Sequence, residues 1–399
     1  MTAKWNTEQR KLSIAKLASI LFFTYWLGGC ASTSSNIQAE YDTNTEAKFP
    51  ELSVFYDDPS QRLRQECLSF DAQSALHYCS ENTVDTLYYW KAFEQSNMFD
   101  DVSFADKEAE FKVAISTVSL LNETAGDLTN AVVSGASLLL IPMTSESEVR
   151  AEVSLYWRDV KLKQFTYQLP HVNTVSLFSD HEKADKDFAA SLVSHIIADF
   201  QQENVFSSSL IADVLESTDY ANDVVFPETI SEFEYAGQFA FFDPFLGVMA
   251  TYLSPEYVND KIDVFVYPIR SVDLNDSETL LNNEMANVQK EIEYVITKQE
   301  WEGLAFSEAQ KVVLPHGDMM LDGIHFGGSY FSELGEESFT SVYLFKYKDK
   351  FIKFRASFPS QYIGPHIEAV LPKVTVPGES KFMAEARSQE RARLQSEKE

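Results

Sequence analysis

The stretch that decides the fold is Ser341–Phe358, which reads SVYLFKYKDKFIKFRASF. Two runs rich in aromatic and β-branched residues flank the polar triplet KDK at positions 348–350, a pattern typical of two antiparallel strands joined by a turn. Because successive side chains of a strand point to opposite faces, Tyr343 and Phe345 should lie on one face and Lys346 on the other. The stretch therefore predicts a β-hairpin whose basic side chains lie on the outer face of a sheet or at its turn.

The residues before this hairpin predict the rest of its domain. Leu246–Leu253 and Lys261–Ile269 read as paired strands, Ser277 caps a helix, and strand patterns resume at Lys311. The apolar face of the helix consists of Leu281, Met285, Val288, Ile292 and Val295. The order of strands, helix and strands predicts an antiparallel sheet with one packed helix over residues 223–376.

The sequence predicts a mixed domain at residues 51–222 as well. Asn82–Gln95 has helical spacing, Phe111–Thr117 alternates like a strand, and Val149–Leu169 alternates like a hairpin. The apolar positions of the helix are Val84, Leu87, Tyr88 and Ala92. Strands and helices interleave in this part of the chain, which favours an α+β arrangement.

Two further helices are predicted in the same domain. Small and apolar residues at Thr124–Ile141 suit a buried helix, and Ser179 and Glu182 have the spacing of a capping box. The apolar face that follows the capping box consists of Phe188, Leu192, Val193, Ile196, Ile197 and Phe200. We therefore expect the α+β class with two mixed domains, a boundary near Tyr220–Pro227, and an exposed, charged helical tail at residues 377–399.

Residues 1–29 have the layout of a signal peptide. The basic residues at its start are Lys4, Arg10, Lys11 and Lys16. The apolar run Leu17–Leu27 that follows is shorter than the roughly 20 apolar residues that a membrane-spanning helix needs. It matches the apolar core of a secretory signal, and the small residues after it lead directly to Cys30.

The tetrapeptide LGGC at positions 27–30 resembles the lipobox of bacterial lipoprotein signals. The resemblance implies that the thiol of Cys30 receives a diacylglycerol, that residues 1–29 are removed, and that the new amine receives an acyl chain such as palmitate. Residues 30–50 would then form a lipidated tether that reaches about 25 Å. Ala31 in place of aspartate implies an outer-membrane protein, which we expect to face the periplasm. An ordinary secretory leader with an incidental cysteine is the alternative.

The composition limits the possible partners. The chain has 61 acidic and 32 basic residues, and removing residues 1–29 deletes four basic residues and one acidic residue, which leaves a formal net charge of −32. Such a surface repels phosphate backbones, so we expect no nucleic-acid partner. The content of hydrophobic residues, 45%, is ample for packed cores.

Cys67 and Cys79 are the two cysteines that the lipobox does not use. An even pair in an exported protein favours a disulfide, which would close a small loop and stabilise the fold by about 3 kcal/mol. Two buried free thiols are the alternative, because spacing does not show that the geometry permits a bridge.

A candidate metal site is His316, Asp318, Asp322 and His325 in the stretch HGDMMLDGIH. These residue types bind divalent metals, and a metal-dependent hydrolase using His316 to His325 is the alternative function. The nearby glycines instead suggest turns, where aspartate and histidine are common. The sequence has no nucleophile elbow, phosphate loop or zinc-protease motif, so no catalytic residue and no cofactor is predicted.

Lys346, Lys353 and Arg355 give the hairpin a basic side in a very acidic protein. They are predicted to bind an anionic partner, and the alternative is that they neutralise carboxylates of the same chain. Trp90–Ser116 is similar to a segment of small α/β domains in envelope lipoproteins, such as the curli-secretion and transport-auxiliary lipoproteins. That similarity implies an accessory role in a multiprotein envelope system.

These observations together predict a lipid-anchored cell-envelope protein that acts as a non-enzymatic binding or assembly factor. The predicted partners are the membrane, reached through the N-terminal lipid, and an envelope protein.

Overall fold

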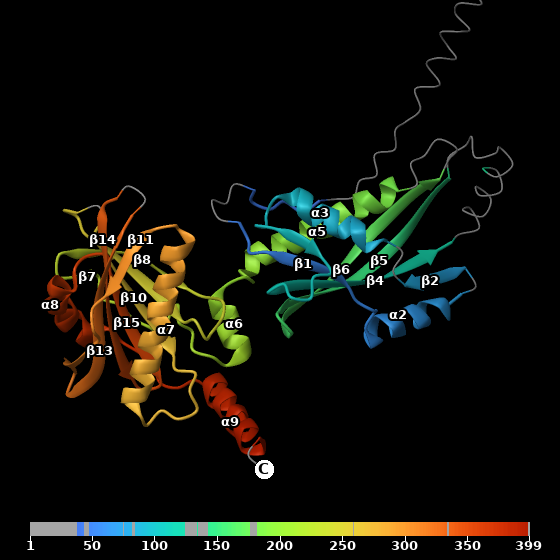
Figure 1. The fold of residues 1–399 in the computed structure, drawn as a ribbon. Helices are drawn as coiled ribbons and strands as arrows, with labels where there is room; N and C mark the ends of the chain where they lie inside the picture. Colours follow the sequence, from blue (N-terminus) through green and yellow to red (C-terminus); the bar gives the residue numbers. More distant parts are fainter. Residues whose placement is uncertain are drawn as a thin grey trace, which may run out of the picture. The chain divides into compact units, whose positions relative to one another are not determined.

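The computed structural model describes residues 38–43, 48–74, 76–81, 84–123, 134, 143–175, 182–257, 259–332 and 335–397. The chain forms two compact units (Figure 1). Unit 1 takes in the described parts of residues 1–109, 113–153 and 165–198, and unit 2 takes in those of 110–112, 154–164 and 199–399. The predicted α+β class is confirmed, since the described residues form helices and two separate β-sheets.

The first sheet and its helices occupy the N-terminal half of the chain. Its elements are β1 (Leu52–Tyr56), α2 (Gln61–Asp71), β2 (His77–Glu81), α3 (Thr86–Ser96), β3 (Val102–Phe104), β4 (Phe111–Asn122), β5 (Met143–Trp157), β6 (Val160–Val175) and α5 (Lys183–Glu203). The strand order is β3-β1-β4-β5-β6, and β2 pairs with β4. The strand predicted at Phe111–Thr117 and the hairpin predicted at Val149–Leu169 are both confirmed.

The helices of this part confirm one predicted face and correct another. The apolar face predicted for α5 is buried from Phe188 to Phe200. In α3, Leu87 is 41% exposed, whereas Tyr89 and Phe93 are buried. The predicted apolar face was therefore wrong by about one residue, because α3 packs on β1 and β3 through Tyr89 and Phe93. Four apolar positions in the sequence are too few to fix which side of a helix faces the sheet.

The predicted disulfide between Cys67 and Cys79 is confirmed. It joins α2 to β2, with 5.4 Å between the two Cα atoms. Its sulfur atoms lie in a small apolar cluster with Val118 and Leu120 of β4. The bridge therefore fastens α2 to the sheet.

The second sheet and its helices follow. Their elements are α6 (Ser208–Leu215), β7 (Thr229–Ile230), β8 (Phe233–Ala240), β9 (Val248–Leu253), β10 (Lys261–Pro268), α7 (Ser277–Lys298), β11 (Glu302–Phe306), β12 (Gln310–His316), β13 (Met319–Phe331), β14 (Glu337–Tyr347), β15 (Lys350–Ala356), α8 (Ser360–Val370), the 3-10 helix η1 (Leu371–Lys373) and α9 (Lys381–Ser396). The strand order is β11-β13-β14-β15-β10-β9-β8-β7, with β12 also paired to β13, and these pairings are antiparallel.

The hairpin predicted at Ser341–Phe358 lies at the centre of this sheet as β14 and β15. Tyr347 pairs with Lys350, and Lys348 adopts a left-handed conformation at the turn, with φ of 54°. Leu344 faces one core of the unit, and Phe345 faces the other. The hairpin thus supplies apolar residues to both faces of the sheet, which is why it organises the unit.

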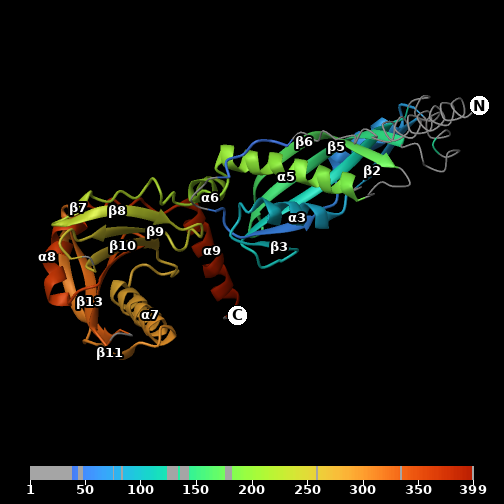
Figure 2. The same cartoon turned by 90° about the horizontal axis from the view of Figure 1, so that it is seen from above.

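Helices cover both faces of the second sheet (Figure 2). The packed helix predicted after residue 276 is α7, which contacts β11, β13 and β14 on one face. On the opposite face, α8 packs through Ile363, Ile367 and Val370.

The predicted cap and one apolar position of α7 were wrong by one residue. Asp276 caps the helix by accepting from the backbone N–H of Thr279.

Packing also corrects the predicted end of the α7 apolar face. Val295 is 41% exposed, and Ile296 is buried in its place. The predicted positions advance by seven residues every two turns, or 3.5 per turn, so by the last turn they drift off a face that follows the true helical period of 3.6 residues.

The basic side of the hairpin does not lie on an outer face, which corrects the prediction. Lys346 and Lys353 are register partners of Phe351 and Leu344, respectively, and both apolar residues belong to the core beneath α7. The basic residues therefore share the sheet face on which α7 packs. An apolar pattern shows that a strand has two faces but does not show which face a helix covers.

The C-terminal tail was predicted to be exposed, and this prediction was wrong for part of α9. Met383 and Arg387 are buried, at 3% and 5% exposure. Arg387 donates to the carbonyl oxygens of Ile269 and Ser271, at 2.6 and 3.2 Å, so α9 is anchored to the segment before α7.

Several predicted features lie outside the described residues. They are the signal peptide at residues 1–29, Cys30, the helix predicted at Thr124–Ile141 apart from Ser134, and Ser179 of the capping box. Among the helices of the described residues, none combines the length and the apolarity needed to cross a bilayer.

Candidate functional site

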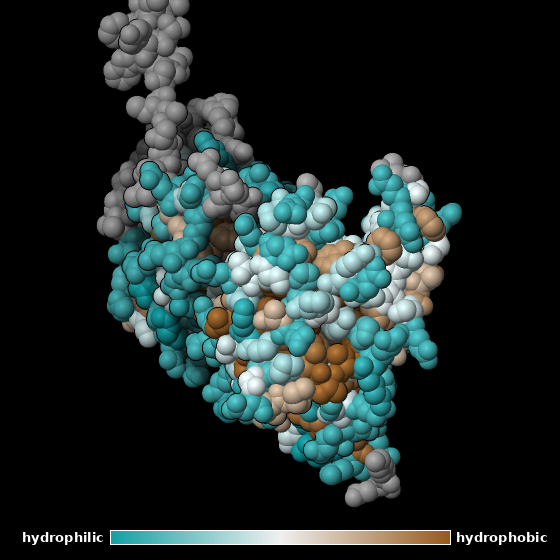
Figure 3. Space-filling model, turned by 90° about the vertical axis from the view of Figure 1, so that its left-hand side faces the viewer, coloured by the Kyte–Doolittle hydropathy of each residue, from teal (hydrophilic) through white to brown (hydrophobic). Residues whose placement is uncertain are grey.

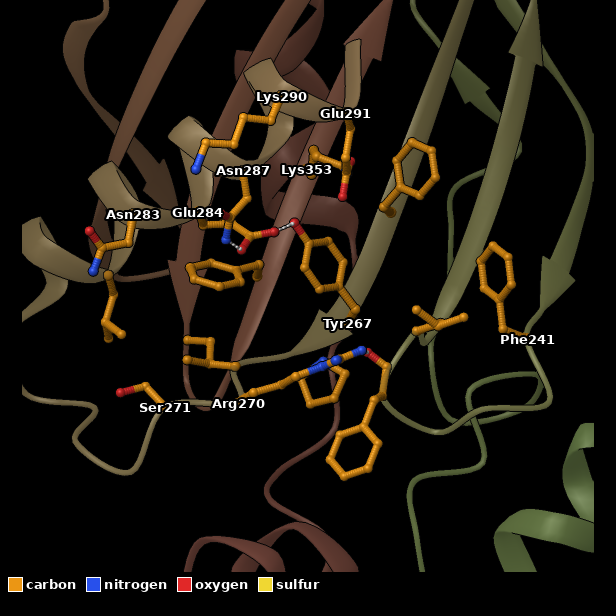
Figure 4. Close-up of a pocket in the computed structure, with 17 residues that line it drawn as sticks. Phe241, Tyr267, Arg270, Ser271, Asn283, Glu284, Asn287, Lys290, Glu291 and Lys353 are labelled. Carbon is orange, nitrogen blue, oxygen red and sulfur yellow. Dashed lines mark hydrogen bonds and ion pairs between the residues drawn. The ribbon is translucent and has the colours of Figure 1, made fainter. Parts of the chain in front are cut away.

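Unit 2 contains an open cleft beside α7 with a volume of about 710 Å³ (Figure 4). A volume of this size is within the range of pockets that bind small molecules or short segments. The residues that line the cleft are Phe241, Phe245, Leu246, Phe265, Tyr267, Pro268, Ile269, Arg270, Ser271, Leu280, Asn283, Glu284, Asn287, Lys290, Glu291, Phe351 and Lys353.

The packing of α7 explains why the cleft is there. The helix lies mainly on β11, β13 and β14, where Ile292 and Ile296 join the core. Its polar residues Asn283, Asn287 and Lys290 line the cleft over β10 and β15 instead. They stand at positions i, i+4 and i+7, which places them on one side of the helix. One helix is too narrow to cover this broad sheet, so the β10 side stays open.

The floor of the cleft is aromatic. Phe265 and Tyr267 of β10 and Phe351 of β15 contribute rings to it. The Tyr267 hydroxyl donates to Glu284 Oε1 at 2.7 Å (Figure 4). Burial and the neighbouring Glu284 carboxylate raise the pKa of Tyr267 well above its ordinary value. Tyr267 therefore stays protonated, and it ties β10 to α7 across the floor.

The apolar floor extends beyond the cleft along β9 and β8. Phe265 pairs with Met249, which pairs in turn with Phe239. Register partners lie on the same face of a sheet, and Phe239 is 52% exposed. Figure 3 shows one face of the molecule, where apolar residues gather in separate patches on a mostly hydrophilic surface. An exposed apolar strip next to a cleft is typical of a binding surface.

Lys353 is the most unusual polar side chain of the cleft. Its side chain is 12% exposed, and its ammonium lies 4.6 Å from the ring centre of Phe265 and 5.2 Å from that of Tyr267. The nearest carboxylate oxygen, Glu291 Oε2, is 3.8 Å away, and no described residue accepts a hydrogen bond from Nζ. Burial lowers the pKa of Lys353. Among the described residues, this ammonium therefore has an ion-pair partner in Glu291 but no hydrogen-bond acceptor.

The wall opposite α7 is a turn between β8 and β9. Asp243 accepts from the backbone N–H of Phe245 at 2.9 Å, which fixes the turn. Gly247 closes it with φ of 70°, a conformation that glycine adopts without strain. The guanidinium of Arg270 lies over the ring of Phe245, 5.1 Å from its centre.

The cleft is locally cationic although the protein is strongly acidic. Two carboxylates line the cleft, and each has a partner in the chain. Glu284 accepts a hydrogen bond from the Tyr267 hydroxyl, and Glu291 forms an ion pair with Lys353. Within the described part of the chain, neither Arg270 nor Lys290 forms an ion pair with a carboxylate. An anion that enters the cleft would therefore meet cations that are free to bind it.

The predicted partner-binding residues do not all line the cleft. Lys353 does, whereas Lys346 and Arg355 share its sheet face outside the lining. Sequence reasoning missed Tyr267, Arg270 and the α7 residues. The spacing of Asn283, Asn287 and Lys290 on the polar side of α7 was a usable signal, but it did not identify what lies opposite.

Two other lysines of the hairpin serve the fold. Lys350 is fully buried and donates to Asp349 Oδ1 and to the Gly378 carbonyl oxygen, at 2.8 and 2.9 Å. Lys348 donates to the Val376 carbonyl oxygen at 2.6 Å. These contacts hold the segment around Val376 and Gly378 against the turn between β14 and β15. Lys350 neutralises Asp349, and both lysines donate to carbonyl oxygens of the same chain.

The candidate metal site is not supported. His316 Nε2 lies 3.3 Å from the Val374 carbonyl oxygen, and the ring of His325 stacks on Tyr343. Asp318 is at the turn between β12 and β13. No group of three or more histidine, cysteine, aspartate or glutamate side chains that could hold a metal is found among the described residues, which include this whole segment. The alternative of a metal-dependent hydrolase therefore lacks its site.

Comparisons with known proteins give no family. No protein-family model matches the chain, and no curated protein matches it. Among solved structures, the chain is similar to cyanobacterial PsbP (CyanoP) from Synechocystis sp. PCC 6803, at 10% sequence identity and a TM-score of 0.24. The match covers 35% of this chain and 83% of that chain. A likeness this weak carries no argument about function.

Proposed function

We propose that this chain is a lipid-anchored cell-envelope protein that acts as a non-enzymatic binding or assembly factor. The partner is an envelope protein, and its binding site is the cleft beside α7. The single observation that carries the proposal is the aromatic cleft around Lys353, whose ammonium has no hydrogen-bond acceptor among the described residues. A partly buried ammonium that lacks a hydrogen-bond acceptor costs stability, so its presence in a surface cleft favours a role in binding.

The location follows from the N-terminal sequence. The LGGC stretch supports attachment of lipid to Cys30, and Ala31 supports residence in the outer membrane, facing the periplasm. Lipid with more than one acyl chain anchors a protein stably. The net charge of −32 after removal of residues 1–29 supports a protein partner rather than nucleic acid.

Site-specific photo-cross-linking tests the binding site. A photoreactive residue replaces Asn287, which is exposed on the cleft side of α7, in the lipidated protein in its own membrane. The control replaces Tyr362, which is 60% exposed on α8, the helix on the opposite face of the sheet. We expect one discrete adduct from position 287, reduced at least threefold by Lys353→Gln, and no adduct from position 362. The same adducts from both positions, or none from either, would contradict the proposal.

A further inference from the structure

We propose that the cleft binds an extended segment of a partner protein that carries both acidic and aromatic or aliphatic side chains. This inference rests on the proposed function and names the chemistry of its ligand. It follows from three properties of the lining: the cations, the floor, and the amides of α7.

The cations select an anionic group. Lys353, Arg270 and Lys290 line one cleft, and these three cations outnumber the two carboxylates of the lining, Glu284 and Glu291. A carboxylate near Lys353 Nζ would supply the acceptor that this ammonium lacks and would replace the water removed by binding. A cationic ligand would instead place like charges together in a partly desolvated site.

The aromatic floor selects the rest of the segment. Phe265, Tyr267 and Phe351 offer ring surface inside the cleft, and Phe239 continues it outside. Apolar side chains that cover these rings bury area worth about 25 cal/mol per Å². An anion without an apolar part, such as free phosphate, would leave this surface exposed to water.

The amides of α7 favour a peptide over a fatty acid. Asn283 and Asn287 lie along the cleft, and Figure 4 shows both projecting from α7 beside Lys290. An asparagine amide both donates and accepts, so it can pair with the main chain of an extended peptide. Asn287 already donates to Glu284 Oε2 at 3.4 Å, and within the described residues the rest of its amide remains for a ligand. An acyl chain offers these amide groups no hydrogen-bond partner.

The length of the cleft fits a short peptide. Its lining residues on α7 run from Leu280 to Glu291, about 16 Å at 1.5 Å per residue. About five residues of extended chain, at roughly 3.3 Å each, have this length. The distant acidic surface opposes such a segment only weakly at physiological salt, where the screening length is about 8 Å.

A displayed library of random nine-residue peptides tests the ligand class. The full chain, extracted in mild detergent, is the target at physiological ionic strength. We expect selected peptides to be enriched at least threefold in aspartate and glutamate, together with phenylalanine, tyrosine and leucine. Selection of basic peptides, selection of none, or displacement of the acidic peptides by decanoate at equal concentration would overturn the inference.

Two variants test whether the enrichment of acidic and apolar residues comes from binding in the cleft. In one, Lys353, Arg270 and Lys290 are each replaced by Gln, and the enrichment should disappear. The matched control changes the charge equally outside the cleft, through Gln replacements of the exposed lysines Lys107, Lys298 and Lys373. It should select the same peptides as the unchanged protein. An enrichment that persists in the cleft variant would overturn the inference.

The two proposals fail in different ways. Lys353→Met is used alone if the triple variant does not fold, because a methionine fills the same space without a charge. Discrete cross-linking at Asn287 without acidic peptides in the selection would refute only the ligand class. Absence of cross-linking at Asn287 would refute the binding site itself.

Discussion

At the scale of residues, Lys353 links stability to binding. Its ammonium lies among aromatic rings with one carboxylate, that of Glu291, 3.8 Å away, and burial lowers its pKa from the ordinary value of 10.5. We expect Lys353→Met to leave the free energy of unfolding unchanged or to raise it by about 1 kcal/mol at pH 7, because the charge no longer has to be buried. Urea unfolding of both proteins measures the difference, and a clear loss of stability in the variant would contradict it.

The pH dependence of that difference has a defined sign. Because the folded pKa of Lys353 is lowered, the unfolded chain binds this proton more tightly, and the unchanged protein gains stability as pH rises toward 10.5. Lys353→Met lacks this titration. Relative to Lys353→Met, the unchanged protein should therefore gain stability between pH 7 and pH 10.5. A difference that stays constant over this range would show that Lys353 is not desolvated.

Gly247 tests the turn that forms the cleft wall. Its φ is 70°, and an added Cβ would overlap the carbonyl oxygen of Val266. We expect Gly247→Ala to lower the free energy of unfolding by at least about 2 kcal/mol, from left-handed strain plus the clash. Gly317→Ala is the control, since its φ is 60° and no atom lies within 4 Å of the added Cβ. If both variants lost the same free energy of unfolding, the clash with Val266 would not explain the effect of Gly247→Ala.

At the scale of elements, α9 depends on one buried guanidinium. Arg387 donates to the Ile269 and Ser271 carbonyl oxygens and pairs with Glu379. We expect Arg387→Ala to lower the free energy of unfolding by about 3 kcal/mol, because it leaves buried acceptors unpaired. Arg391→Ala, an exposed change on the same helix, should have an effect below about 0.5 kcal/mol. Similar losses in the two variants would mean that α9 is not anchored by Arg387.

The disulfide sets the stability of the α2–β2 region. Replacing Cys67 and Cys79 together by Ala should lower the free energy of unfolding by about 3 kcal/mol, since the bridge closes a loop of 12 residues. Thiol alkylation of the native protein checks the premise. Two reactive thiols before reduction would refute the bridge.

Elements with strong local patterns were predictable. The hairpin β14–β15 has two runs rich in aromatic and β-branched residues around a polar triplet, and α5 has a continuous apolar stripe, so each pattern identifies its element. Helix caps and rotations were wrong by one residue, as at Asp276 and Ile296, because tertiary packing decides them. The cleft was not predictable, since it depends on which strands α7 leaves uncovered. Of the residues that line the cleft, the sequence predicts only Lys353 as a binding residue, because of its charge.

At the scale of the whole molecule, the proposed attachment of lipid to Cys30 is open to a direct test. We expect Cys30→Ser to block lipidation and leave an uncleaved precursor, because a hydroxyl is a far weaker nucleophile than a thiolate. Metabolic labelling with an acyl analogue measures this. Label retained by the variant would refute the anchor.

The most direct test of the binding site is the affinity of the partner cross-linked at Asn287 for the unchanged protein and for Lys353→Met. The dissociation constant should rise at least tenfold, or about 1.4 kcal/mol, because the variant loses a charge-assisted hydrogen bond. The melting temperature of the same samples should not fall. Equal dissociation constants for the two proteins would contradict the claim that this cleft, through Lys353, holds the partner.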